Sequence, residues 1–421
     1  MKRALLGTLW IGVVASILVI GLQLAGLLAR SSLGVSLLLH LSPNEKMGIG
    51  NFLVVILLGF AVAWSMLEVP TALRRAAMFL LILAELIGAA WVLQLYKVNF
   101  PPLPALIVLL LATGLAIAVT ATQQARRRRK TAQLFGGRLA QSVHDQLAQA
   151  EALDLSQPIA REASFVFCEM ANESDLIEEL APVDCAQLTR GFIEHATRCF
   201  LQEGGYLHAA DGEGIRVLFG FPSESERHSA DAARAALHFR DNFRAASVAQ
   251  PDSLGKIDLR IGISSGAVVA TVQDDAPGSE VVVAGEPLEV ARRLARANRV
   301  YGSQILLGPR TFSMAKRAIV ARPIDFLRSV EPHDRLEVYE LLALTEKATP
   351  AEIARRDCFW TAIVYFRERR WTESFAEFNR ARTDSSEQDQ PLQWYLRQLE
   401  PLCLKTATEP VPASKPLAPF P

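Results

Sequence analysis

The sequence predicts a chain of three parts: a multi-span α-helical membrane domain, an α+β domain and a C-terminal α-helical hairpin. Three observations lead to this prediction. The first quarter of the 421 residues is nearly free of charge, whereas the rest has the composition of an ordinary soluble protein. Short β-rich runs and amphipathic stretches alternate from residue 162 to residue 344 without a strict βαβ repeat. Beyond residue 350 the apolar residues recur at helical spacing only.

The first stretch, Ala4–Ala29, has no charged residue and is long enough to cross a hydrocarbon core, which needs about 20 apolar residues. A cleaved signal peptide is the alternative, but the stretch exceeds the usual h-region of about 7–15 residues and no small-x-small cleavage site follows. Three more spans are expected at Met47–Leu67, Ala76–Tyr96 and Pro104–Thr122. Residues 1–125 are therefore predicted to form a four-helix transmembrane region.

The distribution of basic residues predicts the orientation of these spans. Lys2 with Arg3, Arg74 with Arg75, and the run Arg126–Lys130 all fall on one side if the N-terminus is cytoplasmic. The large soluble part is then expected in the cytoplasm, and the outer connections are too short for a folded sensor domain. Glu85 lies in the middle of the third span, where it is either a functional group or a protonated carboxyl bonded across a helix contact.

Residues 126–160 are expected to form a basic juxtamembrane segment and a linker helix. The run "ARRRRK" at 125–130 suggests nucleic-acid or anionic-lipid binding, but directly after a span it favours a topology anchor that touches lipid head groups. Apolar residues then recur at helical spacing, and the pair Gly136–Gly137 places the helix at about Arg138–Leu153.

Overall charge and cysteine usage exclude little. Lys plus Arg number 44, equal to Asp plus Glu, so net charge gives no reason to expect a nucleic-acid partner. The five cysteines show no CxxC spacing and no histidine cluster, which indicates reduced thiols in the cytosol.

The α+β part can be divided into elements in chain order. "EASFVFCEM" (162–170) is a strand, and "PVDCAQLTRGFIEHATRCFLQEGG" is an amphipathic helix with a Gly-Gly stop. "GYLHAADGEGIRVLFGFP" is a hairpin that turns at Asp211–Gly214. The helix "ERHSADAARAALHFRDNFRAA" precedes two or three strands with a hairpin at Asp274–Gly278. A helix to Asn298, "SQILLGPRTFSMAKR" and a closing strand "RLEVYELLAL" complete a mixed or mostly antiparallel sheet.

This order of elements, with "VLFGFP", "HSADAARAAL", "RIGISSGAVV", "GEPLEVARRLA", "SQILLG" and "LEVYELL", resembles the class III adenylate/guanylate cyclase homology domain. The resemblance covers residues 161–344, and "LFGGRL" is similar to the helix before that domain in membrane-anchored bacterial members. It implies a ferredoxin-like βαββαβ core, a head-to-tail dimer with two shared active sites, and a location in the bacterial inner membrane.

The resemblance also implies a site for two Mg²⁺ or Mn²⁺ ions that activate a ribose hydroxyl and steady the pyrophosphate. The two aspartates of the family correspond here to Glu169 and Glu213, each longer by one methylene. The phosphate-binding turn corresponds to Asn172–Glu173–Ser174, where an acidic side chain opposes a triphosphate.

Four further positions carried over from the family concern the base and the transition state. The base-reading lysine and aspartate correspond to Ala209 and Glu286, and the asparagine and arginine that meet transition-state charge correspond to Glu289 and Arg293. Of the six positions only Arg293 is retained as such. The active-site motifs are therefore degenerate.

These substitutions favour a signalling protein that works by dimerisation, or by binding a nucleotide or a protein partner. The enzymatic alternative is a cyclase that converts ATP or GTP with glutamate ligands to Mg²⁺ or Mn²⁺. A third hypothesis is that the chain supplies half of a heterodimer with an active cyclase.

Residues 351–405 are similar to a single tetratricopeptide-type helical repeat followed by one more helix, with Ala362, Tyr365, Phe378 and Ala381 at the expected spacing. One repeat cannot bury its own apolar face, so it is expected to pack on the α+β domain or on a partner. The Pro-rich tail 406–421 is expected to be disordered.

Overall fold

A computed structural model describes residues 2–25, 49–69, 72–96, 102–149, 157–251, 254–273, 280–328, 335–383 and 389–408. The chain divides into two compact units, Met1–Arg129 and Lys130–Pro421. Each unit is described by itself below. The expected outer connections, the Asp274–Gly278 hairpin turn and most of the Pro-rich tail lie outside the described residues.

The first unit is built from apolar helices. They are α1 (Lys2–Leu24), α3 (Ile49–Glu68), α4 (Ala72–Leu95) and α5 (Pro102–Phe135). Within the described residues, α1, α4 and α5 are long and apolar enough to cross a membrane, while the apolar part of α3, Phe52–Glu68, is shorter. Helices α1, α3 and α5 bury apolar side chains in one cluster, and Glu85 is exposed on α4.

Helix α5 runs further than the sequence indicated. The last span was expected to end at Thr122, but α5 continues through the basic run to Phe135 because Arg, Lys, Gln and Ala all favour helix. Gly136, with φ +50°, then ends it, and a 3₁₀ turn (Gly136–Arg138) leads to α6 (Gln141–Gln149). The linker helix therefore begins three residues later than predicted.

The second unit contains one mixed sheet. Its strands are β1 (Ile159–Met170), β2 (Tyr206–Asp211), β3 (Gly214–Phe219), β4 (Leu259–Gln273), β5 (Glu280–Ala284), β6 (Ile305–Leu307), β7 (Ile319–Arg328) and β8 (Arg335–Leu344). The order across the sheet is β2-β3-β1-β4-β6-β8-β7, and β5 pairs with the end of β4. All pairs are antiparallel except β4 with β6. The expected mixed sheet is confirmed.

Strand β7 was not predicted from the sequence. Its run is broken by Pro323 and by charged residues, and its pairing with β8 shifts register at two points, before Ala321 and before Asp325. An irregular edge strand of this kind lacks the alternating pattern on which strand prediction depends.

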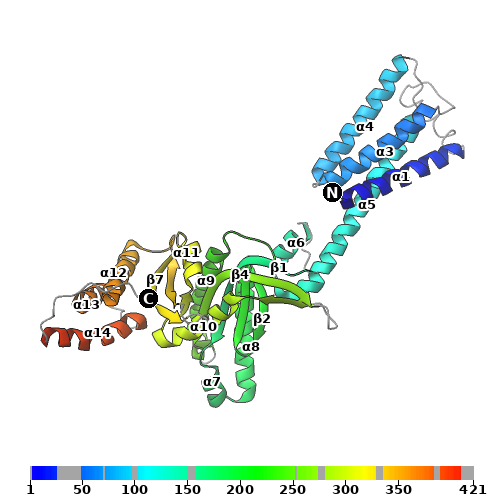
Figure 1. The fold of residues 1–421 in the computed structure, drawn as a ribbon. Coiled ribbons are helices and arrows are strands. Elements are labelled where there is room, and N and C mark those ends of the chain that lie inside the picture. The colour runs from blue at the N-terminus through cyan, green and yellow to red at the C-terminus, as the bar shows by residue number, and fades with distance from the viewer. Residues whose placement is uncertain are drawn as a thin grey trace. The chain divides into compact units, whose positions relative to one another are not determined.

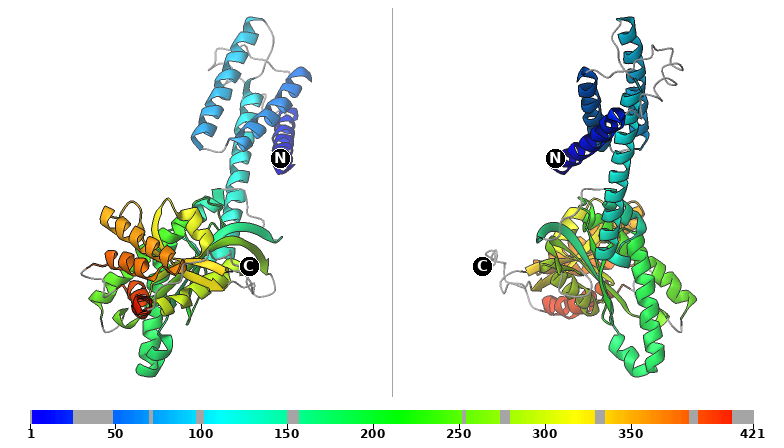
Figure 2. Two further views of the ribbon diagram at one scale, coloured as in Figure 1. Left: turned by 60° about the vertical axis from the view of Figure 1, so that its left-hand side comes forward. Right: turned by 90° about the vertical axis from the view of Figure 1, so that its right-hand side faces the viewer.

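Helices cover both faces of the sheet. They are α7 (Glu173–Glu179), α8 (Pro182–Gln202), α9 (His228–Ala249), α10 (Glu286–Tyr301), α11 (Pro309–Ala315), α12 (Pro350–Arg367), α13 (Trp371–Arg380) and α14 (Gln390–Thr408), with a 3₁₀ turn at Leu254–Lys256. Figure 1 shows α8 and α9 along the sheet and α12–α14, in orange and red, beside β7. The long strands β1 and β4 curve together in the left view of Figure 2.

The two faces have separate cores. One face buries the aromatic and aliphatic side chains of α8 and α9 against β1, β3, β4 and β6. On the other, α10 and α12–α14 share a core with β6, β7 and β8, including Leu294, Phe359 and Phe378. The apolar side of the C-terminal helices is therefore covered by the same chain.

Candidate functional site

The end of β1 and the β2–β3 hairpin bring two carboxylates to one place. Glu169 lies opposite Gly214 in the β1–β3 pairing, so Glu213 is the next residue along. Gly214 has φ +141°, and a Cβ there would lie 2.1 Å from the carbonyl oxygen of Cys168. Only glycine lets the hairpin approach β1 this closely. The turn is closed by the Glu213 amide, which donates to Asp211 Oδ1 at 3.1 Å.

Helix α10 presents an arginine to this hairpin. Arg292 Nη2 donates to Glu213 Oε2 in an ion pair. Arg216 Nη2 lies 3.5 Å from the same carboxylate oxygen and 2.8 Å from Asp211. The guanidinium carbons of Arg216 and Arg292 stand 5.7 and 6.0 Å from the centroid of the Phe167 ring. Glu213 is therefore already paired with arginines of the same chain.

A surface pocket lies at this point. Its lining includes both carboxylates, two residues of the predicted phosphate turn and two further arginines of α10; the residues are Glu169, Met170, Ala171, Glu173, Ser174, Glu213, Arg296 and Arg299. The structure thus brings together the predicted metal positions and most of the predicted phosphate turn.

The charges in this pocket oppose one another. Burial raises the pKa of Glu169, and the negative charge of Glu213 raises it further, while Arg296, Arg292 and Arg260 act to lower it. Burial also raises the pKa of Glu173, again with a contribution from Glu213. The net direction is upward for both carboxyls: for Glu169 burial, with the charge of Glu213, outweighs the arginines, and for Glu173 burial and the charges of Glu213 and Asp211 act together.

Asn172 has a structural role at this corner. Its Nδ2 donates to the carbonyl of Lys256 at 2.7 Å, and its Oδ1 accepts from the amide of Asp258 at 2.8 Å. The side chain thereby joins the start of α7 to the segment before β4. These contacts point its amide toward the protein backbone.

The four base and transition-state positions do not line the pocket in the described chain. Glu286 is the first residue of α10 and is exposed. Arg293 Nε donates to Glu289 Oε1 at 3.0 Å, and both side chains are about half exposed, at 43% and 50%. Ala209 lies in β2 opposite Arg216, next to a register shift. One chain therefore does not assemble all six positions.

The carboxylates do not fit a divalent metal site of the family kind. Mg²⁺ requires free carboxylate oxygens in near-octahedral geometry. Glu213 is instead bound to Arg292, and in the described part of the chain no group of three or more His, Cys, Asp or Glu residues is arranged to hold a metal ion.

Three arginines at this site were not singled out from the sequence. They are Arg292, Arg296 and Arg299 of α10. Their spacing of four and then three residues places them on one side of α10. This spacing, together with the acidic residues of the hairpin, is the sequence pattern that could have predicted these arginines at the site.

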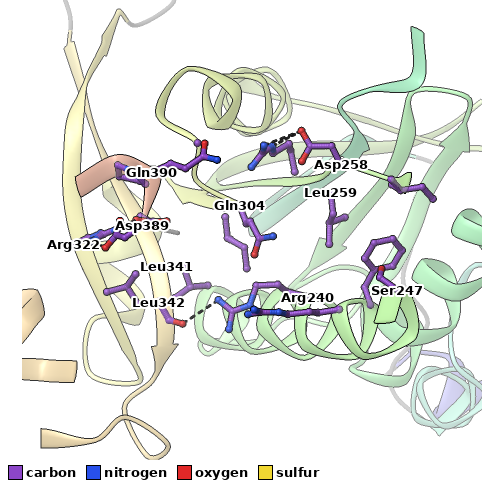
Figure 3. A pocket seen from close by; sticks show the side chains of 18 of the residues that line it. Arg240, Ser247, Asp258, Leu259, Gln304, Arg322, Leu341, Leu342, Asp389 and Gln390 are labelled. Atoms are coloured by element: carbon purple, nitrogen blue, oxygen red, sulfur yellow. Dashed lines mark hydrogen bonds and ion pairs between the residues drawn. The ribbon is translucent and has the colours of Figure 1, made fainter. Parts of the chain in front are cut away.

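A second pocket lies between α9, the start of β4 and the start of α14, and is shown in Figure 3. Most of its ionic groups are already paired: Arg260 with Asp258 at 2.9 Å, and Arg322 with Glu340 and Asp389 at 2.7 Å each. Arg240 Nη1 donates to the carbonyl of Leu342 at 3.1 Å. The pair of Arg322 with Asp389 joins the start of α14 to the sheet.

Comparisons with known proteins give an independent result. Residues 156–300 match the family model for the adenylate and guanylate cyclase catalytic domain. Adenylate cyclase 1 of Rhizobium meliloti is 20% identical over 193 residues, 46% of this chain and 29% of that protein. An adenylate cyclase of Anabaena cylindrica is 22% identical over 158 residues, 37% of this chain and 31% of that protein. The chain thus aligns with less than a third of each of these relatives.

Among solved structures, the adenylyl cyclase CyaB from P. aeruginosa is similar, with a TM-score of 0.41 and 17% identity over 46% of this chain and 100% of that one. A bacterial light-regulated adenylyl cyclase aligns with a TM-score of 0.42 and 18% identity over 54% of this chain and 62% of that one. The family match coincides with the strands and helices that hold Glu169, Glu213 and α10. By this family match, residues 156–300 of the α+β part are similar to the catalytic domain of adenylate and guanylate cyclases.

Proposed function

We propose that this chain is a membrane-anchored signal-transduction protein whose cyclase-like domain is catalytically impaired and acts through dimerisation, or by binding a nucleotide or partner. The observation that carries the proposal is the ion pair between Glu213 and Arg292. A second pair, Arg293 with Glu289, engages the one transition-state residue that the family pattern retains. Glu213 and Arg293, which the cyclase reaction would need, are thus each paired with a neighbour of opposite charge.

The assembly we propose is the head-to-tail dimer of the family, built on a ferredoxin-like βαββαβ core. In support, β1, α8, β2, β3, α9 and β4 follow one another in that order, and the four strands lie as β2-β3-β1-β4. Arg293, Glu289 and Glu286 are exposed and away from the pocket, so a second copy or a heterodimer partner is needed to complete a site.

For the location we propose a multi-pass anchor in a bacterial inner membrane, with residues 1–125 as four spans and the cyclase-like domain in the cytoplasm. The basic run after the last span supports this orientation. Residues 351–405 would be a tetratricopeptide-type segment covering the sheet. Carbonate washing of membranes should leave the full chain in the pellet, and release into the supernatant would contradict the anchor.

An assay for cyclic product tests the proposal directly. The purified full chain is incubated with ATP or GTP and with Mg²⁺ or Mn²⁺, beside an active class III cyclase as positive control. We expect no cAMP or cGMP above the buffer blank. Product that disappears in the Glu169→Ala variant would show that the domain is an active enzyme.

The rival function, an active cyclase with glutamate ligands, has one observation in its favour. Glu169 and Glu213 line the same pocket, as metal ligands must. In that case Mg²⁺ or Mn²⁺ would be the cofactor and a nucleoside triphosphate the substrate. The heterodimer hypothesis predicts that Arg293→Ala lowers cyclic product only when a partner cyclase is present.

A further inference from the structure

The cyclase-like pocket contains its own positive charge. Three carboxylates, Glu169, Glu173 and Glu213, line it together with Arg296 and Arg299 of α10. A third arginine of α10, Arg292, is paired with Glu213. In a two-metal site the positive charge comes from the ions. Here three guanidinium groups of the chain itself stand against the three carboxylates.

The position of these arginines is determined by backbone packing. Gly262 of β4 lets α10 lie so close that a Cβ would stand 2.0 Å from the carbonyl oxygen of Ala291 and 2.4 Å from the amide nitrogen of Ala295. The buried side chain of Asn298 donates to the carbonyls of Ile261 at 2.9 Å and Leu294 at 3.1 Å. Helix α10 therefore cannot move away from β4 without breaking buried contacts.

Arg292 occupies the carboxylate oxygen of Glu213 that a metal ion would have to bind. A carboxylate holding Mg²⁺ or Mn²⁺ must offer its oxygens to the ion, and Oε2 of Glu213 accepts instead from Arg292. Arg216 approaches the same oxygen from β3 at 3.5 Å. A divalent ion entering here would meet two guanidinium groups at short range.

We propose that Arg292, Arg296 and Arg299 take the place of the divalent ions, so that this domain has no Mg²⁺ or Mn²⁺ site and takes no metal–nucleotide complex. The three arginines act as permanent counter-charges to the carboxylates. A polyphosphate gains little from a pocket whose charges already cancel, whereas the family pocket with its two ions carries an excess of positive charge.

The test is a Mn²⁺ titration of the purified full chain, followed by the electron paramagnetic resonance signal of free Mn²⁺. The natural chain should show no saturable site. Removing the arginines in the double variant Arg292→Ala/Arg296→Ala should create one, with an affinity at least about tenfold higher than any residual binding. Adding Glu213→Gln to the double variant should abolish that gain.

Arg190→Ala is the matched control, because it also removes an arginine from an ion pair with a glutamate, at 2.8 Å to Glu194 on α8. It should leave Mn²⁺ binding as in the natural chain. If the double variant unfolds, as judged by its melting curve, the single variants Arg292→Gln and Arg296→Gln carry the same expectation.

Saturable Mn²⁺ binding by the natural chain that is lost in Glu213→Gln would overturn the inference. So would a folded double variant that binds no more Mn²⁺ than the natural chain. The inference shares with the proposed function only the assumption of this fold. Different results would contradict the inference and the proposed function. Mn²⁺ binding without cyclic product defeats only the inference, and cyclic product formed in the presence of EDTA defeats only the proposed function.

Discussion

Gly262 shows how one residue controls the geometry of the pocket. It lies in β4 under α10, where the space for a side chain is occupied by the helix backbone. Backbone atoms cannot rotate away as a side chain can, so any larger residue must push α10 off the sheet. The arginines of α10 would then move with it.

We expect Gly262→Ala to destabilise the second unit by about 3 kcal/mol or more, because the added methyl group overpacks a backbone contact. Thermal unfolding of the full chain, with CD or intrinsic fluorescence as the signal, measures the change. Gly191→Ala is the control, since nothing lies within 4 Å of its Cβ position and alanine favours helix. Equal melting temperatures for the Gly262 variant and the natural chain would contradict the packing argument.

Among the elements, the C-terminal end of α5 packs against the sheet. Phe135 is 3% exposed and packs edge-on against two rings. The distance between ring centroids is 5.7 Å to Tyr206 and 6.2 Å to Phe221. Leu139 is buried in the same cluster. The residue that ends α5 is therefore part of the core under the sheet.

Phe135→Ala should cost about 3–5 kcal/mol, because it leaves a cavity among aromatic rings that are held by the sheet. Limited proteolysis should then cut the chain near Gly136 faster than in the natural protein. Gln133→Ala, an exposed neighbour on the same helix, should leave the cleavage rate unchanged. Equal cleavage of the Phe135 variant and the natural chain would show that the ring does not anchor α5.

The C-terminal helices are attached to the sheet by a second element-level contact. Arg322 of β7 donates to both carboxylate oxygens of Asp389 at 2.7 and 2.8 Å and to Glu340 at 2.7 Å, and its guanidinium lies 4.2 Å from the centroid of the Phe359 ring. The Arg322 side chain is 8% exposed. This arginine thus joins β7, β8, α12 and the start of α14.

We expect Arg322→Ala to destabilise the protein by about 3–5 kcal/mol, since it leaves Glu340 buried without its partner. The loss should appear first as faster proteolysis between α13 and α14. Arg190→Ala removes an ion pair at a fully exposed position and should have no measurable effect. If both variants melt alike, the buried network contributes nothing beyond a surface pair.

At the scale of the whole molecule, the half-buried His195 and the buried His228 are expected to make stability depend on pH. Burial lowers the pKa of His195, and Arg198 adds to this. Burial also lowers the pKa of His228, with Arg310 acting in the same direction and Glu162 and Asp231 opposing. As the pH decreases below the ordinary histidine pKa of 6.5, the unfolded chain binds protons at these two rings more readily than the folded chain does. The free energy of unfolding therefore decreases as the pH is lowered.

Replacing His195 by Gln should therefore reduce the pH dependence. From pH 7.5 to pH 5.5 the melting temperature of the natural chain should fall more than that of His195→Gln, because the variant has no ring to protonate in the unfolded state. Differential scanning calorimetry on both proteins in matched buffers measures the two slopes. Identical slopes would mean that His195 does not contribute.

Local sequence determined most of the elements of this protein and their order. The strands at 162–170 and 335–344, the hairpin at Asp211–Gly214 and the helices that became α8, α9 and α10 follow from hydrophobic periodicity and turn residues, which are properties of neighbouring positions. The family resemblance was carried by such short motifs and is confirmed by the family match at residues 156–300. Strand β7 and the full length of α5 were not predicted, because neither has a clear pattern in the local sequence.

Only the tertiary structure decided what the candidate site contains. It turned Asn172 toward the backbone of Lys256 and Asp258, and it set Arg292 on Glu213, 79 positions apart in the chain. An exposed arginine looks the same in the sequence whether its helix faces solvent or a distant carboxylate. Which of these applies depends on how α10 crosses β4, and that crossing is determined by packing between segments far apart in the sequence.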